Sequence, residues 1–118
     1  MNSAPLRVFV FTTLALASAC SYYPRSAPPP TSITAAYEEV ARRSDASADQ
    51  ARLERGRSTF VSKCGECHDH PDLSAIALAE WPEILARMAG KAELEGASAR
   101  ELESFVLAAA EASGAPAR

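Results

Sequence analysis

The fold can be inferred from one stretch, Gly56-Arg-Ser-Thr-Phe60-Val-Ser-Lys-Cys64-Gly-Glu-Cys67-His68. Gly56, Phe60 and Cys64 recur at the spacing of one helix face, which predicts a helix that ends just before the first cysteine. Two thiols and an imidazole follow within five positions. The stretch therefore combines a packing face with a compact group of reactive side chains.

Cys64-Gly-Glu-Cys67-His68 is the attachment signature for c-type haem. Two thiols three positions apart lie on one turn of chain, where they can reach the two vinyl groups along one haem edge. The adjacent His68 is then directed beneath the iron as the proximal ligand. We therefore predict one covalently bound haem c, held by Cys64, Cys67 and His68.

Three other uses of the cysteines are possible in principle. A thioredoxin-like site needs a neighbouring βαβ pattern, which the sequence lacks. A zinc site needs four ligands, and His70 alone does not complete the set. A Cys64–Cys67 disulfide stays open as an alternative, although it would close a very short loop and stabilise little.

The second axial ligand is predicted to be Met88, the one methionine besides the initiator. A thioether opposite histidine favours reduced iron and raises the reduction potential. His70 is tied to the proximal side by its closeness to His68, and a lysine would have to lose a proton. The alternative is that Met88 only fills the core, together with Trp81 and Leu85 on the same helix face.

The remaining pattern is helical and contains no convincing strand. Ser47 and Gln50 form one capping box and Ser98 and Glu101 another, and Pro82 is a favourable first helical residue. The expected helices cover residues 35–43, 47–63, 82–90 and 98–113. We therefore predict an all-α domain of three to four helices packed around the haem.

Size and charge restrict the function. The chain has 118 residues, a net charge of −3 and a pI near 5.4, which argues against nucleic-acid binding. Alanine is the most frequent residue, so the apolar fraction of 47% overstates the core. A domain of this size usually needs a disulfide, a metal or another staple, and a haem would supply it.

The N-terminus is predicted to direct export. Residues 1–19 combine a positive Arg7, the apolar run 8–17 and the small-residue cleavage site Ala17-Ser-Ala19, as in a signal peptide. The run is too short for a membrane-spanning helix. The protein is therefore expected to face the periplasm.

Leu16-Ala-Ser-Ala-Cys20 resembles the lipobox of bacterial lipoproteins, which implies a lipidated Cys20 and a membrane anchor. The alternative is cleavage after Ala19 that leaves a free thiol. Ser21 is not the aspartate that commonly retains such proteins in the inner membrane, so outer-membrane sorting is favoured. Residues 20–34, with three consecutive prolines, are expected to form a semi-rigid tether, and residues 35–118 the folded domain.

From about Leu53 to Ala110 the chain resembles small monohaem cytochromes c of class I. In that family the glycine and aromatic of the first helix, here Gly56 and Phe60, pack on an aromatic of the last helix, which Phe105 matches. The segment 81–88 is similar to the one that presents the axial methionine. Pro71 lies close to the position whose carbonyl accepts a hydrogen bond from the proximal histidine, and this role is left open.

The resemblance implies single-electron transfer rather than enzymatic turnover, with redox proteins of unknown identity as donor and acceptor. Two alternative functions stay open. One is a haem enzyme or gas sensor whose sixth coordination site is open. The other is a haem subunit of a larger dehydrogenase or reductase.

Overall fold

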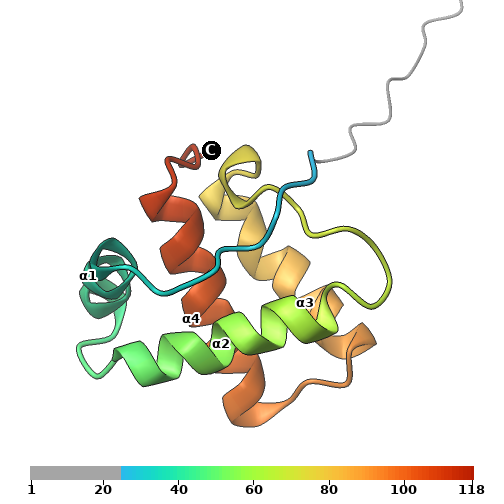
Figure 1. Ribbon diagram of the computed structural model, residues 1–118, viewed down its shortest axis with the longest axis horizontal. Helices are drawn as coiled ribbons and strands as arrows, with labels where there is room; N and C mark the ends of the chain where they lie inside the picture. Colours follow the sequence, from blue (N-terminus) through green and yellow to red (C-terminus); the bar gives the residue numbers. More distant parts are fainter. Residues whose placement is uncertain (1–24) are drawn as a thin grey trace, which may run out of the picture.

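The computed structural model describes residues 25–118, which fold into helices and contain no strand (Figure 1). In chain order the elements are α1 (Ala35–Ser44), α2 (Gln50–Lys63), the short 3-10 turns η1 (Leu73–Ala75) and η2 (Leu78–Glu80), α3 (Trp81–Lys91) and α4 (Gly96–Ala112). The predicted all-α class is confirmed, and each predicted helix is present with shifts of a few residues at its ends.

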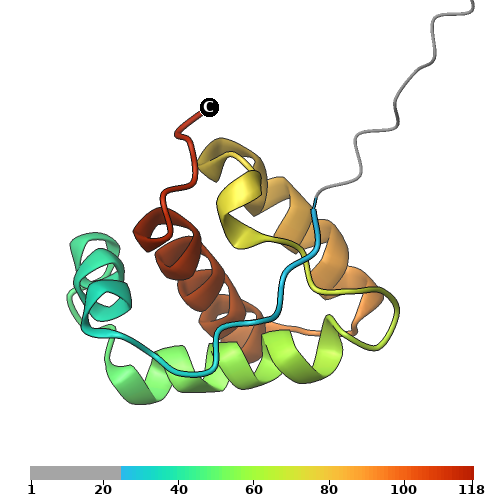
Figure 2. The same cartoon turned by 45° about the horizontal axis from the view of Figure 1, so that its top comes forward.

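Helix α4 is the centre of the domain. Helix α2 crosses it, α1 packs beside it, and α3 and both 3-10 turns also pack against it (Figures 1 and 2). Its buried face is formed by Leu102, Phe105, Val106 and Ala108–Ala110. Three of these residues, Ala108–Ala110, are buried alanines, so the abundant alanine has a packing role in the core.

Helices α2 and α4 meet at Gly56. A Cβ atom placed on Gly56 would lie 2.7 Å from the Cβ of Phe105 and closer still to the carbonyl oxygen of Glu101. Beside this crossing, the rings of Phe60 and Phe105 have their centroids 5.7 Å apart. The packing of Gly56 and Phe60 on Phe105 that the family resemblance implied is therefore present.

Both predicted capping boxes are wrong. The N-cap of α2 is Asp49, whose carboxylate accepts from the amide of Arg52 at 2.8 Å, while the hydroxyl of Ser47 donates to Asp45. Helix α4 begins at Gly96, so Ser98 lies inside it and has its hydroxyl on the carbonyl of Glu95. At α2 the N-cap is the charged Asp49, which lies nearer the helix, because the hydroxyl of Ser47 already has Asp45 as its partner.

The segment ahead of α1, residues 25–34, lies against the domain (Figure 2). The amide of Ala27 donates to the carbonyl of His70 at 3.1 Å, and the amide of Asp72 donates to the carbonyl of Arg25 at 2.6 Å. Farther along, the guanidinium of Arg57 donates to the carbonyl of Pro30 at 3.2 Å. We call residues 25–34 the strap, because this part of the predicted tether is fastened to α2 and to the loop that follows it.

The predicted signal peptide and Cys20 lie outside the described residues. Within residues 25–118, no helix combines the length and the hydropathy that crossing a bilayer requires.

Candidate functional site

Cys64 lies where α2 ends. Its backbone amide donates to the carbonyl of Phe60 at 3.3 Å, which makes it the C-cap residue. Its side chain is half-buried against the core, and this burial raises the pKa of the thiol. Cys67 is exposed, and both cysteines are free thiols rather than a disulfide. Thus one turn of chain carries one exposed thiol, Cys67, and one half-buried thiol, Cys64.

The turn from Cys64 to Cys67 depends on Gly65. A Cβ atom there would lie 2.7 Å from the Cε1 atom of His70 and 3.1 Å from the carbonyl oxygen of Val61. Any other residue would push the imidazole of His70 away from the helix end. The small residue between the thiols therefore allows the chain to fold back tightly over the end of α2.

His68 is exposed and has one ring nitrogen engaged. Its Nδ1 lies 2.7 Å from the carbonyl oxygen of Asp69. Because a carbonyl only accepts, Nδ1 carries the hydrogen, and in the neutral imidazole the lone pair is on Nε2. The observed acceptor is thus Asp69 rather than Pro71, whose role the sequence left open. This tautomer leaves Nε2 free to coordinate a metal.

His70 has a different role that the sequence analysis missed. Its Nε2 lies 3.1 Å from the carbonyl oxygens of both Phe60 and Val61, and its ring centroid is 5.0 Å from that of Phe60. The ring thus caps the last turn of α2 by sharing one N–H between two carbonyls. A histidine shortly after a helix end is a weak sequence signal for such a cap.

An open cavity of about 640 Å³ lies beside this turn. Its volume falls in the range of about 300–1,000 Å³ typical of small-molecule and cofactor sites. Its wall is formed by Ser26 of the strap and by Gly65, Glu66, Cys67, His68, Asp69 and Pro71. The exposed thiol and the imidazole therefore face one space.

Met88 is not part of that wall. It lies half-buried on α3, which packs on α4 and η2. Its neighbours on the predicted face, Trp81 and Leu85, are buried, as expected. Cys64 is also absent from the wall, so of the four predicted haem-binding residues the structure places only Cys67 and His68 on the cavity, with Cys64 half-buried at the end of α2.

Trp81 carries a buried donor that is not satisfied. Its side chain is only 2% exposed, and Nε1 has no hydrogen-bond partner among residues 25–118. Leaving such a group unpaired costs about 1–3 kcal/mol. A bound group with an oxygen acceptor near α3 would relieve this cost.

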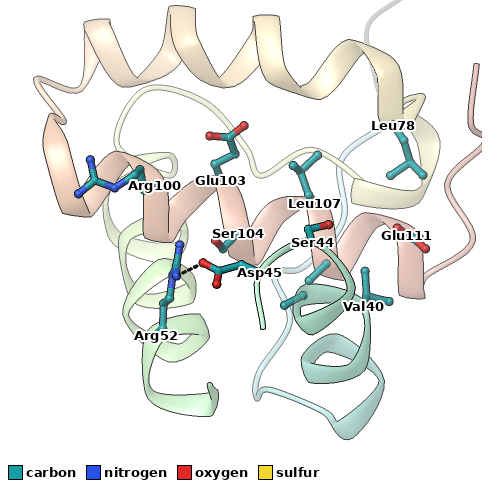
Figure 3. A pocket seen from close by; sticks show the side chains of 12 residues that line it. Val40, Ser44, Asp45, Arg52, Leu78, Arg100, Glu103, Ser104, Leu107 and Glu111 are labelled. Carbon is teal, nitrogen blue, oxygen red and sulfur yellow. Dashed lines mark hydrogen bonds and ion pairs between the residues drawn. The ribbon is translucent and has the colours of Figure 1, made fainter. Parts of the chain in front are cut away.

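A second cavity, of about 350 Å³, lies between α1, α4 and η2 (Figure 3). An ion pair between Arg52 and Asp45 forms part of its wall. The carboxylate of Asp45 accepts from the hydroxyl and amide of Ser47 and from Arg52, which lowers its pKa to about 2. None of the residues 64–70 lines this cavity, so it is separate from the cysteine site.

Among residues 25–118, no cluster of three or more histidine, cysteine, aspartate or glutamate side chains is arranged to hold a metal ion. No protein-family profile, curated protein or solved structure matches the chain. The geometry around Cys64, Cys67 and His68 is therefore the basis for a functional proposal.

Proposed function

We propose that this protein is an exported, lipid-tethered monohaem cytochrome c that transfers single electrons and turns over no substrate. The observation that carries the proposal is the turn at the end of α2. There the free thiol of Cys67 and the imidazole of His68 line an open cavity, the Nδ1 of His68 is engaged by a backbone carbonyl, and the free thiol of Cys64 lies three positions before Cys67. This donor set fits a covalently attached haem c.

Cys64 and Cys67 would hold the haem. Each thiol would add across one vinyl group, with its sulfur bonding to one carbon and its hydrogen going to the other, so the step needs no oxidant. Cys67 is the more accessible of the two, because Cys64 is half-buried against the core. The half-buried thiol would tie the haem to the end of α2, since Cys64 is also the cap of that helix.

His68 would be the proximal ligand through Nε2. Its Nδ1–H is held by the carbonyl of Asp69, the kind of second hydrogen bond that fixes the tautomer and orientation of a metal-binding histidine. His70 is unsuited to the role because its Nε2–H is shared between two carbonyls of α2. The bound haem supplies one-electron redox chemistry at its iron.

Met88 is our proposed second axial ligand, which would leave the iron without an open site. Because Met88 lies outside the cavity wall, the alternative function is a haem enzyme or gas sensor with an open sixth coordination site. A weak near-infrared Fe–S band would support Met88, whereas binding of carbon monoxide would support the alternative. Co-purification with a larger enzyme would instead indicate a subunit of a dehydrogenase or reductase.

Haem attachment is tested by expression together with a haem-attachment system, followed by haem staining after denaturing electrophoresis. The wild type should retain stain, and the double variant Cys64→Ser/Cys67→Ser should lose it. Ser62→Ala, an exposed position on the same helix, is the matched control and should stain like the wild type. Absence of covalent haem from the wild type, or stain in the double variant, contradicts the proposal.

Lipidation at Cys20 is tested separately with labelled palmitate. We expect incorporation into the wild type and none into Cys20→Ser. Label that persists in the variant would show that Cys20 is not the attachment point.

A further inference from the structure

The strap connects the N-terminal segment directly to the loop that carries the candidate haem site. The amide of Ala27 is bonded to the carbonyl of His70, and the carbonyl of Arg25 to the amide of Asp72. These two bonds flank an antiparallel bridge between Ser26 and Pro71. The strap is thus paired with the backbone two to four positions after His68.

The same residues form part of the site. Ser26 lines the cavity beside Cys67 and His68. The contact of Arg57 with Pro30 holds the strap a second time, against the middle of α2. The described part of the chain therefore begins at the rim of the cavity rather than at α1, where the sequence placed the start of the folded domain.

The length of chain ahead of the strap limits where an anchor can lie. Five positions separate Cys20 from Arg25. A fully extended chain spans at most about 3.6 Å per residue, so the two residues are at most about 18 Å apart. If the whole tether to α1 were free, the domain could move much farther from the anchor and turn any face to the membrane.

We propose that the strap orients the protein, so that the cavity beside Cys67 and His68 is held close to the bilayer and the redox partner is a protein of the same membrane. The inference rests on the proposed function, both on lipidated Cys20 and on haem at Cys64 and Cys67. A partner that diffuses freely in the periplasm would have restricted access to this face.

The test places a flexible insertion either ahead of the strap or within it, after the residues 25–30 whose hydrogen bonds hold it to the domain. About ten glycine and serine residues, which span roughly 17–19 Å as a flexible coil, are inserted between Pro24 and Arg25 or between Thr31 and Ser32. The lipidated, haem-loaded protein is reconstituted into vesicles of phosphatidylcholine and phosphatidylglycerol that contain a headgroup fluorophore. Haem quenches such a fluorophore by energy transfer, which falls steeply with distance.

The first insertion should reduce quenching at least twofold, because it lengthens the path from anchor to cavity. The second should leave quenching at the wild-type level, since the strap still joins the anchor to the loop. Equal loss in both variants would overturn the inference, because residues 25–34 would then act as a free tether. Quenching unchanged in both would also overturn it, because the strap would then not set the distance.

Haem stain and palmitate label are measured on the same samples. A wild type that lacks either one contradicts the proposed function, whereas samples that carry both and respond equally to the two insertions contradict only the orienting role of the strap.

Discussion

Gly56 lies directly against Phe105, with room for a hydrogen atom but not for a methyl group. A Cβ at this position would also collide with the backbone of Glu101, which cannot move without displacing α4. The closeness of α2 to α4 therefore depends on one missing side chain. Since Cys64 caps the same helix, this crossing also positions the candidate site.

We predict that Gly56→Ala destabilises the protein by about 1–3 kcal/mol, because overpacking at the crossing outweighs the better helix propensity of alanine. Gly90→Ala is the matched control, since Gly90 is helical and nothing lies within 4 Å of its added Cβ. It should stabilise by up to about 1 kcal/mol. Denaturant titration of the purified variants measures both, and equal effects would contradict the crossing.

Substitution of His68 and of His70 should change the free energy of unfolding by different amounts. His70→Ala should lower the free energy of unfolding by about 1–3 kcal/mol, because it removes the cap on α2 and the ring contact with Phe60. His68→Ala should change it by no more than about 0.5 kcal/mol before haem is attached, because that side chain is exposed. Denaturant titration of the haem-free protein measures both changes.

The haem-loaded samples should show the opposite order. His68→Ala should alter the spectrum of the reduced protein strongly, and His70→Ala should leave the axial ligation unchanged. If His70→Ala lost the proximal ligand and His68→Ala kept it, His70 and not His68 would be that ligand.

Met88→Ala should lower the reduction potential and allow carbon monoxide to bind, because an axial thioether stabilises reduced iron and fills the sixth site. Axial ligands and their surroundings set haem potentials over about 0.8 V, and we expect a fall on the order of 0.1 V or more. Ile84→Ala, another half-buried residue of α3, is the control for packing effects. An unchanged potential and spectrum in Met88→Ala would exclude it as a ligand.

Lowering the pH should reduce the stability that Asp45 contributes between α1 and α2. The pKa of Asp45 is about 2 in the folded protein against an ordinary value of 3.8, chiefly because its carboxylate accepts from Ser47 and from Arg52. A lowered folded pKa stabilises the protein above the unfolded value, and this stabilisation is lost as the pH falls from about 4 to about 2. Asp45→Asn should therefore show a weaker loss of stability across this window.

Thermal unfolding between pH 2 and 5 measures this effect. Glu39→Gln, an exposed carboxylate of α1, is the control and should keep the wild-type pH dependence. If Glu39→Gln and Asp45→Asn lost the same amount of thermal stability between pH 5 and pH 2, Asp45 would not be the titrating group.

The sequence by itself determined the parts that depend on local spacing. Periodicity of apolar residues predicted the helices, because one buried face per helix imposes that spacing. The crossing of α2 and α4 at Gly56, Phe60 and Phe105 was implied by the resemblance to small class I cytochromes c rather than by spacing alone. The thiols and imidazole at Cys64, Cys67 and His68 predicted the site, since residues at most four positions apart cannot be far apart in space.

Tertiary structure decided everything that joins distant segments. The cap of α2 by His70 and the bonds of Ala27 and Arg25 to the loop after the cysteines join groups whose partners cannot be read from spacing. The same is true of the position of Met88, which depends on how α3 packs. Hydrogen bonds of this kind form only after the helices have packed, because packing determines which polar groups lie within reach of one another.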